Sequence, residues 1–174
     1  ARTPANVRSI YSSYYTDISV DTYNTDWCPG VTTEVMIEGV PTQKITGLGC
    51  EGIDFQSGRF DATGFGFFHM DIWTETDLQD KSFNFKFSDW QGGDGEAGAW
   101  EYSATNGNIL TPGSEGTWIS IDIPFSAPTF NCIVFGIDLF AVSTINFLIV
   151  ESDGFSLHIS YELTSIISPD SSAS

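Results

Sequence analysis

Basic side chains are scarce in this sequence. Lys and Arg together number 6 against 23 Asp and Glu in 174 residues, which gives a formal net charge of −17 at pH 7. Binding to nucleic acid needs a basic surface that neutralises phosphates, and docking on anionic lipid needs basic clusters. The charge balance therefore argues against both kinds of partner.

Long apolar runs are also missing. A membrane-spanning helix needs about 20 consecutive apolar residues. The longest candidate, Cys132–Val142, is shorter than this and contains Asp138. No basic segment followed by an apolar one stands at Ala1, so no signal peptide is expected there. We therefore expect no insertion into a membrane.

Cysteine is rare, with three residues and no Cys-x-x-Cys pair, which argues against zinc and thioredoxin-type chemistry. Cys28 and Cys50 flank the first two predicted strands and could form one disulfide. Three reduced, mostly buried thiols are the alternative. If the protein is secreted, Cys28–Cys50 is the expected pair, and Cys132 is left free.

Helical periodicity is absent, and two-residue alternation recurs instead. Phe83–Phe87, Ile119–Ile123 and Phe155–Leu163 each place apolar side chains at every second position. Further strand candidates are Val31–Ile37, Lys44–Leu48, Gly52–Phe55, Phe65–Thr74 and Ile145–Val150. Aromatic residues make up 14% of the chain, and there are 17 glycines, as is typical of β-rich folds with tight turns. The sequence predicts an all-β protein, an antiparallel β-sandwich of the jelly-roll type.

The two ends differ from the rest of the chain. Residues 1–6 (ARTPAN) and 168–174 (SPDSSAS) are small, polar and proline-containing, so both are interpreted as linker-like. Residues 7–167 are predicted to form a single sandwich module. We expect this module to be fused to, or processed from, a larger protein.

The alternation predicts a polar face on the sheet. If Phe68, Met70 and Ile72 point into the sandwich, the side chains between them point outward. The same reasoning applied to three strands assembles one outward face from Trp73, Trp118, His69, Asp71, Asp122, Asn84 and Lys86. Tryptophan rings suit the apolar face of a sugar, and short polar side chains suit its hydroxyls. The alternative is that each tryptophan simply packs under a loop.

Residues Asp89–Trp100 (DWQGGDGEAGAW) form a second candidate, interpreted as a long binding loop. Trp90 and Trp100 would be its ring-stacking residues. Asp89, Asp94 and Glu96 could supply oxygen ligands to a structural Ca²⁺. A plain solvated loop without metal is the alternative.

Catalytic signals are weak. Phe68–Glu75 (FHMDIWTE) superficially resembles the Glu-x-Asp-x-x-Glu strand of jelly-roll glucanases, but His69 stands where the nucleophilic Glu would be. The chain has two histidines, and no Gly-x-Ser-x-Gly elbow accompanies either. We therefore expect no enzymatic activity.

Several segments carry a family resemblance, in order along most of the chain. They are Val7–Ile18 (VRSIYSSYYTDI), Thr25-Asp26-Trp27, His69–Thr74 (HMDIWT), Phe83–Asp89 (FNFKFSD) and Gly116–Phe125 (GTWISIDIPF). Together they resemble a non-catalytic carbohydrate-binding module found in secreted polysaccharide-utilisation proteins of Bacteroidetes-type bacteria. The resemblance implies a β-sandwich attached to glycoside hydrolases or surface glycan-binding proteins, often with a structural Ca²⁺.

This chain departs from the family pattern at three points. Ser12-Ser13 replaces Ser-Asp, and His158 stands about where an Asp is expected, which weakens the expectation of Ca²⁺. The second tryptophan that often follows in the loop after Trp27 is missing, which argues against a ligand site in that loop.

The leading hypothesis is a secreted or cell-surface, non-catalytic module that targets a larger protein to a neutral polysaccharide. A structural subunit of an extracellular appendage, surface layer or virion, self-associating through an edge strand, is the first alternative. A jelly-roll glycoside hydrolase is the second, and the residue at position 69 argues against it.

Overall fold

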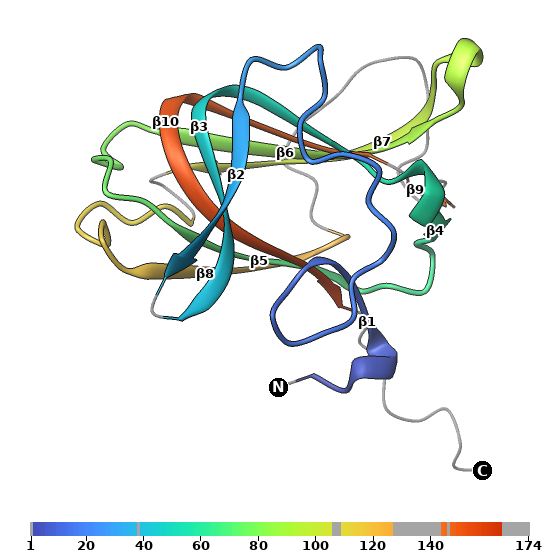
Figure 1. Cartoon of the computed structure of the whole chain (residues 1–174), viewed down its shortest axis with the longest axis horizontal. Helices are drawn as coiled ribbons and strands as arrows, with labels where there is room; N and C mark the ends of the chain where they lie inside the picture. The colour runs from blue at the N-terminus through green and yellow to red at the C-terminus, as the bar shows by residue number, and fades with distance from the viewer. Residues whose placement is uncertain (1, 38, 106–108, 127–143, 146, 165–174) are drawn as a thin grey trace.

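Strands dominate the chain (Figure 1). The computed structural model describes residues 2–37, 39–105, 109–126, 144–145 and 147–164. The strands are β1 (Val7–Tyr11), β2 (Val31–Ile37), β3 (Val40–Asp54), β4 (Phe60–Asp61), β5 (Phe67–Trp73), β6 (Ser82–Trp90), β7 (Glu96–Thr105), β8 (Trp118–Pro124), β9 (Thr144–Ile145) and β10 (Phe147–Thr164). The described residues contain no α-helix, only the 3₁₀ turns η1 (Pro4–Asn6), η2 (Gln56–Gly58) and η3 (Gly92–Asp94). The all-β prediction is confirmed. Within the described residues, no helix has the length and apolar character that a membrane span needs.

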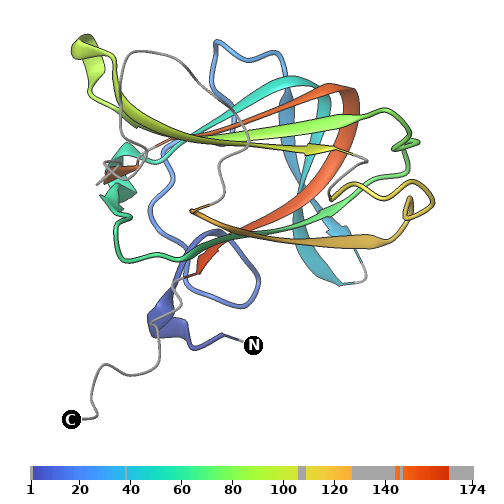
Figure 2. The same ribbon diagram turned by 180° about the vertical axis from the view of Figure 1, so that it is seen from behind.

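Two long strands run through both layers of the sandwich. The first part of β10, residues 147–152, pairs with β6, and its second part, residues 158–164, pairs with β5. Strand β3 accompanies β10 on its other side over residues 43–54. Because β6 also pairs with β7, and β5 with β8, the bent β3–β10 pair joins an upper β6–β7 layer to a lower β5–β8 layer (Figures 1 and 2).

The core lies between these layers. Phe68, Met70 and Ile72 of β5 are fully buried, as the alternation predicts. The Phe68 ring centroid lies 4.9 Å from that of Phe85 and 5.0 Å from that of Phe87, both on β6. The inward side chains of the two layers therefore meet directly.

This contact corrects the predicted polar face. Because Phe68 and Phe85 point toward each other, their neighbours His69 and Lys86 point outward on opposite sides of the sandwich. The seven residues that the sequence analysis assigns to one outward face therefore belong to two separate faces. We name the outer side of β5 and β8 the His69 face; it carries His69, Asp71, Trp73, Trp118, Ser120 and Asp122. We name the outer side of β6, β7 and the adjoining end of β3 the Lys86 face; it carries Asn84, Lys86, Glu101 and Ser103.

The predicted long loop is also corrected. Asp89 and Trp90 end β6, and β7 begins at Glu96, so the connection is a tight hairpin around η3. The Gln91 N–H donates to the carbonyl of Gly95 at 2.7 Å. The glycines at both ends of η3 have positive φ, of 65° and 82°, which a tight turn requires.

Trp100 is part of the core rather than a binding residue of a loop. Its side chain is 3% exposed and its indole Nε1–H donates to the carbonyl of Phe125 at 3.0 Å. The ring packs against Phe68, Phe87 and Phe125. The alternation of β7 places it inward because residue 100 pairs with the buried Phe87.

The Cys28–Cys50 disulfide is confirmed, with its Cα atoms 5.1 Å apart. Cys132 lies outside the described residues, as do the predicted 168–174 tail and residues 165–167 at the end of the predicted module.

Candidate functional site

The Lys86 face is a fixed polar surface. The Lys86 ammonium contacts the carboxylates of Glu96 at 2.9 Å and Glu101 at 3.2 Å. Ser103 donates to the Asn84 side-chain oxygen at 2.6 Å across the β6–β7 pair. Burial lowers the pKa of Lys86, but the hydrogen bonds and charges of the two glutamates outweigh it, so that the pKa is raised. This lysine stays charged, and its charge is balanced locally.

Trp27 extends this face, although the sequence reasoning did not include it among the binding residues. Its side chain is 56% exposed. Gly52 of β3 is in register, through β10, with Lys86, so a side chain at position 52 would share the outward face of Lys86. A Cβ at Gly52 would lie 2.6 Å from Cη2 of Trp27, so the indole lies on the bare backbone there. The Trp27 ring therefore stands on the same face as Lys86.

Trp90 is the second exposed tryptophan of this layer, at 42%. It ends β6, two residues after Ser88, whose hydroxyl donates to Glu96 at 2.7 Å. Trp90 is accessible, whereas Trp100, predicted as its ring-stacking partner, is buried.

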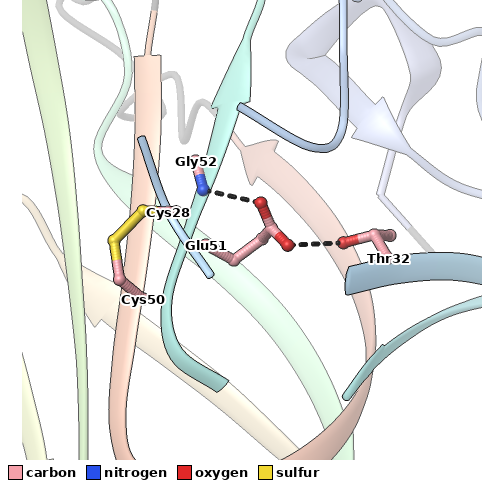
Figure 3. The surroundings of a disulfide bond; sticks show 5 residues. All are labelled: Cys28, Thr32, Cys50, Glu51 and Gly52. Atoms are coloured by element: carbon pink, nitrogen blue, oxygen red, sulfur yellow. Dashed lines mark hydrogen bonds between the residues drawn. A yellow bond between two sulfur atoms is a disulfide. The ribbon is translucent and has the colours of Figure 1, made fainter. Parts of the chain in front are cut away.

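A buried carboxylate fastens the segment that carries Trp27 (Figure 3). Glu51 is 0% exposed and accepts from the Gly52 N–H at 2.9 Å and from the Thr32 hydroxyl at 3.2 Å. Its side chain lies on the opposite side of β3 from the Cys28–Cys50 disulfide. The Gly30 N–H donates to the carbonyl of Cys50 at 3.0 Å. The segment before β2 is thus attached to the edge of β3 from both sides.

Glu51 makes stability depend on pH. Burial raises the pKa of its carboxyl, although hydrogen bonds from Gly52, Thr32 and the Thr25 N–H lower it. Because this pKa is higher in the folded protein, the folded state loses stability as pH rises from the ordinary carboxyl pKa of 4.5 through the raised pKa. We expect Glu51→Gln to remove this loss, so that the free energy of unfolding in urea falls less, or rises more, from about pH 4 to about pH 7 than it does for the wild-type protein.

Glu51→Ala is the matched control, because it removes the acceptors of Gly52 and Thr32 and should destabilise at both pH values. If Glu51→Gln keeps the wild-type pH dependence, Glu51 does not titrate in this range.

The His69 face is built around a histidine held by two aspartates. Nδ1 of His69 lies 2.9 Å from Asp122 of β8, and Nε2 lies 3.3 Å from Asp71 of β5. The Arg2 guanidinium pairs with Asp122, and the backbone N–H of Arg2 donates to the Tyr15 hydroxyl at 3.1 Å. Arg2, which lies in the segment predicted as linker-like, therefore contacts this face.

Trp73 and Trp118 stand at one end of the His69 face. They are direct cross-strand partners in the β5–β8 pair, and Asp71 and Ser120 form the next outward pair along the strands. Trp118 is 39% exposed, and Trp73 is half-buried. The sequence prediction that these residues share a face is correct.

The three carboxylates proposed for Ca²⁺ do not come together. Glu96 contacts Lys86 and Ser88, while Asp89 faces the Arg59 guanidinium at 3.8 Å. Across the described ranges, no group of three or more His, Cys, Asp or Glu side chains could hold a metal ion. Asp89, Asp94 and Glu96 therefore do not form the predicted site.

Solved structures share this architecture, whereas no protein-family model and no curated protein matches the sequence. A family 11 carbohydrate-binding module from Clostridium thermocellum, in complex with a β-1,3-1,4-mixed-linked tetrasaccharide, is 15% identical with a TM-score of 0.59, covering 92% of this chain and 96% of that one. The family 11 module of the cellulosomal cellulase Lic26A-Cel5E of the same organism is 16% identical with a TM-score of 0.56, covering 92% and 95%. A family 30 carbohydrate-binding module is 18% identical with a TM-score of 0.55, covering 97% and 92%.

The chain has the fold of these carbohydrate-binding modules. Its similarity spans nearly the whole of each chain, so the shared unit is the complete sandwich rather than one layer of it. The β-sandwich expected from the family resemblance is thereby confirmed. Identities this low establish the fold alone, and the choice of ligand depends on the side chains of the two polar faces.

Proposed function

We propose that this protein is a non-catalytic carbohydrate-binding module that holds a neutral glycan on the Lys86 face. The observation that carries the proposal is Trp27: its indole is 56% exposed yet attached to the sheet by a disulfide next to it in the chain. A ring fixed before binding loses little conformational freedom when a sugar stacks on it.

The polar neighbours suit sugar hydroxyls. Asn84 and Lys86 are each held by partners on β7, so their remaining hydrogen-bonding capacity has a defined direction. Glu96 and Glu101 balance the charge of Lys86, and the net charge of the chain is −17. Both features favour an uncharged glycan over a polyanion.

The wider setting is part of the same proposal. The neighbour in complex with a mixed-linked tetrasaccharide, and the module that belongs to a cellulosomal cellulase, support a polysaccharide ligand and attachment to a larger protein. The disulfide supports a secreted or surface location, since such bonds persist in oxidising compartments. The resemblance to modules of Bacteroidetes-type polysaccharide-utilisation proteins supports the same setting.

Trp27→Ala tests the site. We expect its affinity for a β-1,3-1,4-mixed-linked glucan oligosaccharide, measured by isothermal titration at about pH 8, to fall about tenfold because a stacked ring is lost. Trp27→Phe keeps an aromatic face and should lose less. Met36→Ala is the control, since Met36 is an exposed apolar residue of β2.

Two results would contradict the proposal. Full affinity in a folded Trp27→Ala variant would place the site elsewhere. No binding of the wild-type protein to a panel of neutral gluco-, manno- and galacto-oligosaccharides would remove the carbohydrate function.

A further inference from the structure

The His69 face combines features that the Lys86 face lacks. Both ring nitrogens of His69 face carboxylate oxygens, at 2.9 and 3.3 Å, and the ring is only 7% exposed. A neutral imidazole has one N–H and could donate to one aspartate only. Simultaneous hydrogen bonds to Asp71 and Asp122 therefore require the doubly protonated, positively charged ring.

The described charged side chains around His69 come from three elements, and the backbone of β10 lies beside β5 as well. Asp71 belongs to β5, Asp122 to β8 and Arg2 to the segment before β1, while Glu162 of β10 is the register partner of His69. Arg2 and protonated His69 balance Asp71 and Asp122. Loss of the imidazole proton leaves these four side chains with one uncompensated negative charge.

Exposed parts of the same face are suited to a sugar. Trp118 offers an accessible ring beside Trp73, and Asp71 follows Trp73 at the next outward position of β5. Outward positions two residues apart on a strand lie about 6.6–6.8 Å apart. A ring stacked at the tryptophans would place its rim hydroxyls near the Asp71 carboxylate.

We propose that the His69 face is a second glycan-binding surface, pH-dependent, on which His69 acts as a positioning residue for Asp71 and Asp122. It rests on the proposed function for the class of ligand, an uncharged glycan. His69 is too buried to be a principal contact. It orients the two carboxylates, and these accept hydrogen bonds from sugar hydroxyls.

The direction of the pH dependence follows from the partners. Burial lowers the pKa of His69, but the hydrogen bond and charge of Asp71 and the hydrogen bond of Asp122 outweigh it, so the pKa is raised above 6.5. The His69–aspartate contacts are therefore complete at acidic pH and are lost as pH rises through this raised value. Affinity on the His69 face should fall over the same range, because one aspartate loses its partner and its fixed orientation.

The five tryptophans allow the two faces to be observed separately. In ¹⁵N-labelled protein, the indole Nε1–H signals are assigned with Trp→Phe variants and followed during titration with a β-1,3-1,4-mixed-linked glucan oligosaccharide. Trp73 and Trp118 report on the His69 face, Trp27 on the Lys86 face, and the buried Trp100 serves as the internal reference. We expect the Trp118 response to weaken on the order of tenfold between about pH 5.5 and about pH 8, while the Trp27 response stays constant.

His69→Gln separates positioning from structure. Glutamine can donate to one aspartate but cannot carry the proton, so Trp118 binding should be weak and nearly independent of pH in this variant. The His69 ring nitrogens, assigned against His158→Gln, should show a wild-type titration midpoint above 6.5 whether or not a glycan is present.

The outcomes distinguish this proposal from the proposed function. If Trp27 responds to the glycan but Trp73 and Trp118 do not, the second surface is refuted and the proposed function stands. If Trp118 responds equally at both pH values, or if His69→Gln keeps the wild-type profile, the positioning role of His69 is refuted. If no indole signal shifts with any neutral oligosaccharide, both proposals are refuted.

Discussion

Replacing Cys28 and Cys50 together by alanine should lower the free energy of unfolding by about 3 kcal/mol. The disulfide spans a sequence separation of 22 residues, and its loss frees that loop in the unfolded chain. It also releases one of the two attachments of the segment that carries Trp27, so glycan affinity should fall with stability. Urea denaturation measures the first effect, and titration calorimetry measures the second.

Reductant provides the control for this double variant. Wild-type protein denatured in the presence of a thiol reductant should reach the stability of the Cys28→Ala, Cys50→Ala protein, and the variant should not respond to the reductant. A variant as stable as the oxidised wild-type protein would contradict the prediction.

Truncating the buried indole of β7 should have the largest effect. Trp100→Ala is expected to cost about 3–5 kcal/mol of unfolding free energy, because it leaves a cavity between the layers. It also leaves the carbonyl of Phe125 without its indole donor. Thermal or urea denaturation of the variant measures the loss.

Trp90→Ala is the matched control, since Trp90 lies on the same β6–β7 hairpin but is exposed. Its effect on stability should stay within about 0.5 kcal/mol. Equal losses in the two variants would mean that Trp100 does not pack in the core as described.

The strands themselves were predictable from local pattern. Alternation placed Phe68, Met70 and Ile72 inward and identified Trp73 and Trp118 as outward neighbours, because a strand repeats every two residues whatever it pairs with. The assignment of faces was not predictable in this way. Whether His69 and Lys86 share a side depends on which part of β10 pairs with β5 and which with β6, a long-range property.

Two tryptophans show where local reasoning ends. Trp100 looked like a loop residue because glycines precede it, yet those glycines close a hairpin that brings it opposite Phe87. The sequence singles out Trp27 only within the Thr25-Asp26-Trp27 motif. Its accessibility depends on Gly52, on the partner of Cys28 and on the buried Glu51, all more than 20 residues away in the sequence.

The two strands shared by both layers have a consequence for how the protein unfolds. The 18-residue β10 pairs with β6 of the upper layer and with β5 of the lower layer, and the 15-residue β3 pairs with β10 along both of these parts. Separating the layers would break both strands, so neither layer can open while the other stays folded. Amide hydrogen exchange at the centre of β3 should therefore proceed only through global unfolding, with one common protection free energy for residues that face opposite sides of the sandwich.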